Sequence, residues 1–353
     1  MTGTREPEHT KSGHRILVRW LIPGVGAAGA LAVLFWLYRG LDFDRFLNAL
    51  SSANAGWLAV LMGTILLEQL TRGWKWRQIL YDLKPVSAVR LFGAILAGYG
   101  VGILIPVGVS PLVRSWLIAR LENLRWMAVL MTTAIERFLD GIVFALIAAL
   151  IAVFGQIPNV EGDLHFAIVL AGGLNLALFA GLLAVLFLSR SPLTRDSSRI
   201  SRWIDWVGTK GSGRLAGLRT AILQGIVWPR ARSRQAGAIL ASILMKIIAA
   251  THFVWAGLAV GIVLAPLDYF LVMVVAGFAL VLARFIRVPG GFVLGAGFAL
   301  NLLGVPDEQA LAMILFNHGF SIVLMVGIGL LYLWRSGVDI KAARQLEAGP
   351  DGP

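Results

Sequence analysis

The sequence contains no cysteine and unusually little charge. The absence of cysteine excludes disulfides, thiolate nucleophiles and cysteine-based metal sites. Charged residues make up 14% of the chain, against about 25% in soluble domains. Hydrophobic residues reach 58%, more apolar surface than a soluble fold of this size could bury. A lipid environment resolves this conflict, so the composition indicates an integral membrane protein.

Catalytic and nucleotide-binding motifs are also lacking. There is no Walker motif, nucleophile elbow or HExxH, and the five histidines are scattered without metal-ligand spacing. We therefore expect no metal, no cofactor and no enzymatic activity.

The apolar residues form long continuous runs, whereas a membrane barrel alternates over about ten residues. The predicted fold class is an all-α, polytopic helical bundle, with about seven or eight spans of about 20 residues and two broken segments. The predicted spans are Trp20–Tyr38, Gly56–Leu70, Met127–Phe154, Phe166–Leu188, Ala236–Leu264, Tyr269–Ile286 and Ala310–Trp334. The two shorter, glycine-rich segments are Leu91–Val107 and Val288–Leu303.

Positive charge is unevenly distributed along the chain, whose net charge is +12. The loop Arg190–Arg234 holds ten Lys and Arg residues, whereas Gly155–His165 and Ala265–Asp268 hold acids and no Lys or Arg. The positive-inside rule then places both termini in the cytoplasm, with the protein in the cytoplasmic (inner) membrane. We interpret the basic charge as a match for anionic lipid headgroups, not nucleic acid.

One transmembrane domain is predicted. Residues 1–14 form a polar cytoplasmic tail, residues 15–335 the membrane domain, and residues 336–353 a second cytoplasmic tail. Within it, residues 189–235 form a basic cytoplasmic loop with two short apolar stripes, typical of interfacial helices. These are either ordinary connectors or a surface that gathers lipids.

Proline and glycine interrupt the two short segments at Pro106, Gly108 and Pro289, Gly290, Gly291. Arg90 and Arg114 both carry the charge signature of the cytoplasmic side, so the first segment is predicted to re-enter. Such backbone is tolerated at depth only where protein buries it or where it lines a polar cavity. The second segment either re-enters or crosses, and if it does not cross, the C-terminus would lie outside, against the charge rule.

A gapless internal alignment relates the two halves. Ala128–Phe144 and Gln309–Met325 share a pattern, with Arg137 opposite His318 and Asp140 opposite Ser321. Broken segments at corresponding positions of two halves point to a transport site. Chance similarity between leucine-rich helices is the alternative.

Charged residues inside the predicted spans are the candidate site, because each costs a few kcal/mol at the bilayer centre. Glu136 and Asp140 share a helix face, and Arg137 can reach Asp140 at i+3. The group is either an anion-binding guanidinium held by carboxylates or a structural ion network. His318 is its counterpart in the second half.

Further basic residues extend this candidate substrate-binding set. Glu68 and Arg72 form an i, i+4 pair, in a stretch that either anchors the helix at the membrane interface or binds a phosphate headgroup. Arg114 follows the first break and can add to an anion site. Lys246 is either paired with a carboxylate such as Glu136 or a titrating group.

Three stretches together resemble a known family: R-G-W-K-W-R-Q-I-L from Arg72, L-A-G-Y-G-V-G-I-L-I-P before the first break, and T-T-A-I-E-R-F-L-D ending at Asp140. This sequence is similar to the lysylphosphatidylglycerol synthase transmembrane-region family, also called flippase-like or YbhN-like. The resemblance implies a helical domain with paired re-entrant segments that acts on polar lipids. In multiple peptide resistance factors such a domain precedes an aminoacyl-transferase domain, which is not expected here because the sequence ends at Pro353.

The sequence departs from the family pattern at both breaks. The family often carries P-x-R-x-G-E-x-x-R at the first break, where this chain retains Pro106 and Arg114 but not the inner Arg and Glu. A glutamate common after the second break is Ala296, and the usual arginine of the last helix is His318. These losses argue against ion coupling at those positions and for a different lipid substrate.

Lipid translocation or transport across the cytoplasmic membrane is the function that these features favour, with a polar or isoprenoid-type lipid as substrate. Two alternatives remain: an integral-membrane enzyme acting on a lipid-linked substrate, and a membrane partner of a lipid or glycan-lipid biosynthetic enzyme.

Overall fold

The computed structural model describes residues 39–104, 110–154, 228–285 and 290–336, together with the single positions 173 and 181. Within these ranges every regular element is a helix, which confirms the predicted fold class. The predicted spans Trp20–Tyr38 and Phe166–Leu188 lie outside the described residues, as do most of the basic loop, Pro106, Gly108 and Pro289.

The first half consists of a short helix and a run of four longer ones. They are α2 (Phe43–Ser51), α3 (Ala55–Leu80), α4 (Ala88–Leu104), α5 (Ser110–Glu122) and α6 (Trp126–Phe154). The Asn54 side chain caps α3 by accepting hydrogen bonds from the amides of Gly56 and Trp57, which satisfies donors left unpaired at a helix start. The predicted second span was too short, because α3 continues ten residues beyond Leu70.

The second half repeats this order. It contains α11 (Arg232–Ala259), α12 (Pro266–Phe285), α13 (Gly291–Leu302) and α14 (Asp307–Arg335). Four of the described helices, α6, α11, α12 and α14, are long and apolar enough to cross a membrane, and the bent pair α2 and α3 brings the number to five. The count of seven or eight spans therefore concerns more of the chain than the structure describes.

The two halves correspond residue by residue over a long stretch. Helices α6 and α14 both contain 29 residues, and Trp126 corresponds to Asp307 as Phe154 does to Arg335. The same offset of 181 residues relates the end of α4 to the end of α12 and the start of α5 to the start of α13. The weak sequence repeat is therefore a structural repeat, in which Arg137 corresponds to His318.

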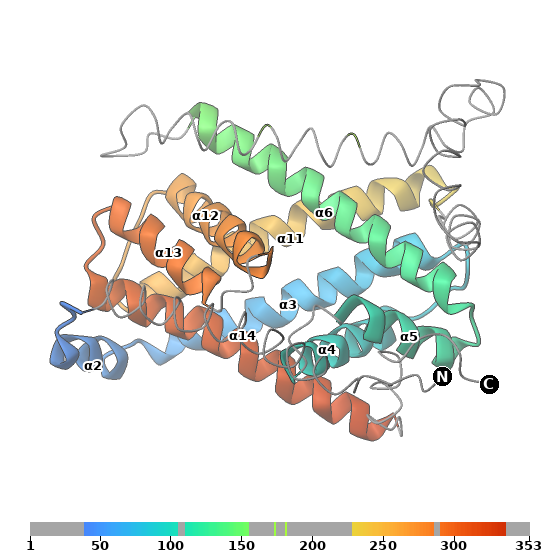
Figure 1. Ribbon diagram of the computed structural model, residues 1–353, viewed down its shortest axis with the longest axis horizontal. Coiled ribbons are helices and arrows are strands. Elements are labelled where there is room, and N and C mark those ends of the chain that lie inside the picture. The colour runs from blue at the N-terminus through green and yellow to red at the C-terminus, as the bar shows by residue number, and fades with distance from the viewer. Residues whose placement is uncertain are drawn as a thin grey trace, which may run out of the picture.

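The halves are inverted relative to each other. Helix α3 packs along α11 in the opposite direction, because the amide of Asn54 donates to the carbonyl of Ala259 at one end and the amide of Arg230 donates to Asp82 at the other. Figure 1 shows this central pair, with α4 and α5 at one end of the molecule and α12 and α13 at the opposite end.

Helices α4 and α5 form a hairpin, and so do α12 and α13. Gly98 and Gly102 lie against Ser110, so α5 returns along α4, and Gly291 and Gly295 lie against the backbone of α12. A methyl group at Gly98 would lie 2.8 Å from the carbonyl oxygen of Ser110. Small residues at these positions let the two arms of each hairpin approach closely.

The return of α13 along α12 determines at which end of the bundle the last helix begins. Helix α12 is long enough to span, but α13 brings the chain back to the end of the molecule where α12 began, and α14 then runs to the opposite end. Helices α12 and α13 thus begin and end at the same end of the bundle, and the C-terminal end of α14 lies at the other. Gly290 begins α13 with a positive φ of 81°, a conformation that favours glycine.

Opposite charges mark the two ends of the bundle. At the end where α3 finishes and α11 begins, basic residues dominate; we call it the basic end. Its charged residues include Lys84, Arg90, Arg125, Arg230, Arg232, Arg234 and Arg335, with Asp82 and Glu122. The other, acidic end carries Asp42, Asp44, Asp268, Asp307 and Glu308, with Arg39 and Arg45.

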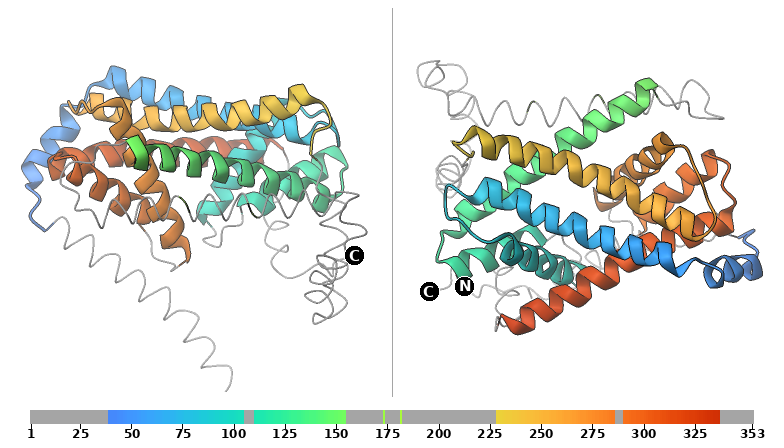
Figure 2. Two further views of the ribbon diagram at one scale, coloured as in Figure 1. Left: turned by 90° about the horizontal axis from the view of Figure 1, so that it is seen from above. Right: turned by 180° about the vertical axis from the view of Figure 1, so that it is seen from behind.

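Each hairpin also packs against the long last helix of the other half (Figure 2). Helix α4 packs against α14, where Gly329 lies against the backbone carbonyl of Leu96. Helix α12 packs against α6, where the Phe144 ring lies over Gly277 and meets Phe278 edge-on, with ring centroids 5.2 Å apart. These two contacts, which we call seams, occupy equivalent positions in the repeat. The seam between α4 and α14 is a contact of backbones, whereas the seam between α12 and α6 is made by side chains.

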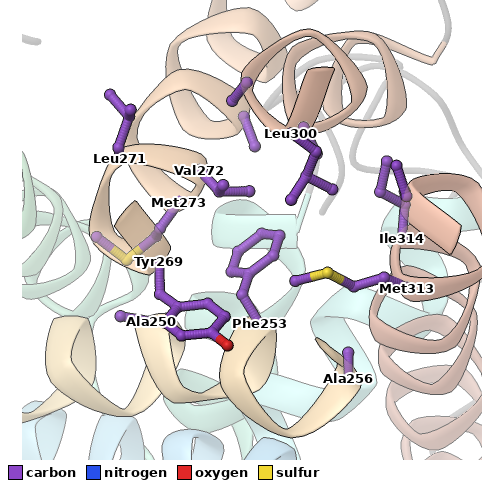
Figure 3. Packing of buried hydrophobic residues seen from close by; sticks show 14 of the residues in the cluster. Ala250, Phe253, Ala256, Tyr269, Leu271, Val272, Met273, Leu300, Met313 and Ile314 are labelled. Atoms are coloured by element: carbon purple, nitrogen blue, oxygen red, sulfur yellow. The ribbon is translucent and has the colours of Figure 1, made fainter. Parts of the chain in front are cut away.

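Two apolar clusters occupy the two ends of the bundle. The larger one contains residues of α11, α12, α13 and α14, together with the first part of α3 and the end of α6. Figure 3 shows Phe253 beside Tyr269 and Met313 at its centre. The second joins α4 and α5 to the ends of α3 and α14. Along α3, Leu61 and Ile65 belong to the first cluster, and Trp76 and Leu80 to the second. Glu68, Arg72 and Lys75 lie between them.

Candidate functional site

A network of buried charges lies between the two apolar clusters, where α3, α5 and α6 meet. Glu136 of α6 is fully buried, with Oε2 2.8 Å from Nη2 of Arg114 and Oε1 3.5 Å from Nζ of Lys75. Lys75 Nζ also donates a hydrogen bond of 2.5 Å to Oδ1 of Asp140. Helix α3 therefore supplies a lysine between two carboxylates of α6, and α5 supplies the arginine.

A second pair continues the network along α3. Nη2 of Arg72 donates to Oε1 of Glu68 at 2.8 Å, and both side chains are largely buried. Nδ1 of His252, from α11, lies 4.0 Å from the other carboxylate oxygen of Glu68. The interpretation of this stretch as an interface anchor is wrong for Arg72, because its side chain is buried in the protein.

Aromatic and hydroxyl groups complete the walls. The guanidinium of Arg114 lies over the Trp76 ring at 5.0 Å, and that of Arg72 lies over Tyr99 at 5.8 Å. Trp76 donates a hydrogen bond to Thr132, one turn before Glu136. Stacking and hydrogen bonding of this kind fix the orientation of the rings and the cations.

The predicted partnership between Arg137 and Asp140 is not made. Arg137 is exposed, and Asp140 pairs with Lys75 instead. Arg137 nevertheless interacts electrostatically with Arg114 and Tyr99. It therefore lies at the edge of the network.

Lys246 of α11 is half-buried beside the network. Its Nζ lies over the Phe144 ring at 5.4 Å, and Asp140 and Glu68 are the carboxylates with which it interacts. The salt bridges of Glu136 are made by Lys75 and Arg114 instead.

His318 lies apart from these residues, in the second half. Its ring stacks on Phe292, the second residue of α13, with centroids 4.7 Å apart, and Phe292 stacks on Phe253 at 6.0 Å. The symmetry mates of Arg114, Glu136 and Asp140 are Gly295, Asn317 and Ser321. Within the described residues the charged site therefore belongs to one half of the repeat.

Lys75 and Tyr99 are the members of the network that sequence reasoning missed. A signal for Lys75 was present, since Leu61, Ile65, Glu68, Arg72 and Lys75 follow one another at spacings of three or four along α3. That spacing places them on one helix face, so the burial of the first two predicts that of the others.

The class of protein follows from this geometry: a membrane-embedded helical protein built as an inverted repeat, with two opposed hairpins and a buried charge network at the first of them. The model of the lysylphosphatidylglycerol synthase TM region matches residues 22–329. The chain belongs to this family, and the resemblance seen in the sequence is confirmed. No curated protein matched the chain.

Proposed function

We propose that this protein moves a polar lipid between the leaflets of the cytoplasmic membrane, with the charge network binding the headgroup. The observation that carries the proposal is the inverted repeat with hairpins that enter from opposite ends. In inverted-repeat transporters, substrate sites lie at the repeat interface, beside discontinuous helices, and one element rocks against the other. The positive-inside rule puts the basic end, and so the base of the first hairpin, in the cytoplasm.

The charge network supports a role in handling headgroups. Buried ionisable groups are costly in a membrane, and most mark a pathway or a binding site. Here they lie at mid-depth, since Asp140 is the central residue of α6. The apolar faces of the bundle remain in contact with lipid, so a headgroup can pass through the protein while the acyl chains stay outside.

The test is lipid movement in proteoliposomes of the purified chain. Fluorescent phospholipids in the inner leaflet are protected from dithionite, so their loss of fluorescence measures transfer to the outer leaflet. We expect transfer well above that of protein-free vesicles, with recovered lipids of unchanged mass. Chemically altered lipid would favour an enzyme, and no transfer for any headgroup would refute the proposal.

A cross-link provides the matched control, because the chain has no native cysteine. Phe292→Cys with His318→Cys, bridged by a short bis-thiosulfonate, ties the second hairpin to α14. Gln78→Cys with Arg234→Cys, which replaces a hydrogen bond of 3.0 Å between α3 and α11, ties the central pair. We expect the first bridge to stop transfer and the second to leave it unchanged; equal effects of both would contradict a moving hairpin.

A further inference from the structure

We propose that the charge network is completed by an anion, and that this anion is the phosphodiester of an anionic phospholipid. The inference rests on the proposed function, for which it names the substrate class. The argument uses the charge balance of the network, the unsatisfied donors of Arg114 and the asymmetry between the two halves.

The network contains more positive than negative charge. The network pairs its three buried cations, Arg72, Lys75 and Arg114, with three carboxylates, Glu68, Glu136 and Asp140. Half-buried Lys246, whose Nζ lies over the Phe144 ring, adds a fourth positive charge beside them. A charge without a partner in a low-dielectric environment is unfavourable, so one further negative charge would stabilise the site. A phosphodiester carries one.

Arg114 supplies donors for that charge. The residue is 1% exposed, yet Nε, Nη1 and Nη2 have no hydrogen-bond acceptor, and Nη2 meets Glu136 at ion-pair distance without hydrogen-bond alignment. Nε of Arg72 is unsatisfied as well. Buried donors are seldom left unpaired, and a guanidinium binds phosphate oxygens through two parallel hydrogen bonds.

Side-chain exposure decreases from Arg137 through Tyr99 to Arg114. Arg137 is exposed in the middle part of an apolar helix, Tyr99 is half-buried, and Arg114 is fully buried. An arginine at the centre of a membrane helix is unfavourable if it faces acyl chains, which argues for a polar neighbour there. We infer that a headgroup meets Arg137 first and Arg114 next.

Among the described residues of the second hairpin there is no such site. Gly295, the mate of Arg114, lies against the backbone of α12 without room for a side chain, and Asn317 replaces Glu136. The headgroup is therefore bound at one hairpin only. The base of that hairpin, where Lys84 and Arg90 bind Glu122, lies at the basic end.

Binding in detergent tests this inference without any need for leaflets. The probes are dioctanoyl phosphatidylglycerol, dioctanoyl phosphatidylcholine, which carries the same phosphodiester with a compensating cation, and glycerophosphoglycerol, which lacks the chains. We expect the anionic lipid to bind about tenfold or more tightly than the zwitterionic one. Equal affinity for the two lipids would overturn the charge argument, and equal affinity for glycerophosphoglycerol would assign the site to a free solute.

Variants give effects of opposite sign, which misfolding cannot imitate. Glu136→Gln releases Arg114 from its competing carboxylate and should tighten binding of the anionic lipid at least threefold. Arg114→Gln with Glu136→Gln keeps the net charge but removes the guanidinium, and should weaken binding about tenfold. Arg120→Gln, on the exposed face of the same helix, is the control without effect.

An unchanged affinity in Glu136→Gln, or wild-type affinity in the double variant, would refute the inference. Its failure is distinguishable from that of the proposed function. Selective binding without transfer in proteoliposomes keeps the anion site and removes the translocator. Transfer of anionic and zwitterionic lipids at equal rates, with equal affinities, keeps the translocator and removes the anion site.

Discussion

Lys75 holds two buried carboxylates together, and its removal should be among the most damaging single changes in the protein. The side chain is fully buried, 2.5 Å from Asp140 and 3.5 Å from Glu136. Removing one partner of a buried ion pair costs about 3–5 kcal/mol, because it leaves an uncompensated charge. We therefore expect Lys75→Met to lower the free energy of unfolding by about that amount.

A double-mutant cycle separates the lost pair from lost packing. Asp140→Asn keeps Glu136 as a partner of Lys75 and should cost about 1–3 kcal/mol. The double variant removes one charge of each sign, so its cost should fall below that of Lys75→Met alone, with a coupling energy of about 2 kcal/mol or more. SDS titration in mixed micelles, followed by tryptophan fluorescence, measures each value.

The control for this cycle is Lys84→Met. Lys84 also pairs with a carboxylate, Glu122, but its side chain is 43% exposed, and exposed pairs contribute about 0–1 kcal/mol. A cost of Lys75→Met as small as that of Lys84→Met would refute the reasoning. So would additive effects of Lys75→Met and Asp140→Asn, since they would mean that the pair carries no interaction of its own.

Two further predictions concern the first hairpin. Gly329→Ala should destabilise the protein by about 1–3 kcal/mol, because the new methyl group meets the Leu96 carbonyl. The control is Gly327→Ala, whose methyl group meets nothing and which should be neutral or slightly stabilising. Equal melting temperatures of the two variants would contradict the close approach of α4 and α14. Burial alone would raise the pKa of Glu122, but hydrogen bonds from its two basic partners outweigh burial and hold the pKa below its ordinary value of 4.5. The stability that this carboxylate contributes is therefore complete above pH 4.5 and is lost as the pH falls below it. Thermal unfolding between pH 6 and pH 3.5 should show a smaller decline in Glu122→Gln than in the wild type, and identical declines would exclude this role.

Much of the helical architecture could be predicted from hydropathy. The predicted span Met127–Phe154 matches α6 to within one residue, because an unbroken apolar run allows no other structure in lipid. The length of helix α3 was underestimated because charged residues interrupt its apolar run. Its charged residues were interpreted as the membrane boundary, whereas they continue the buried face that Leu61 and Ile65 begin.

The site was predicted only in part. Helical spacing correctly placed Glu136 and Asp140 on one buried face, but it could not identify their partner. Lys75 is 65 residues from Asp140 in the sequence, and the distance closes only when α3 and α6 pack together. A local pairing of Arg137 with Asp140 was sterically possible, yet the burial of α6 turns Arg137 away from that face.

The two seams that join the halves have a mechanical consequence. Leu96 and Gly329 press backbone against backbone, so α4 cannot shift relative to α14 without separating the helices. Phe144 separates α6 from α12 by a ring that can change rotamer, and the same ring contacts Lys246, which faces Asp140. Under the proposed function, the first hairpin is therefore the fixed part of the molecule and the second is the part that moves. Phe144 would connect the second hairpin to Lys246, beside the charge network.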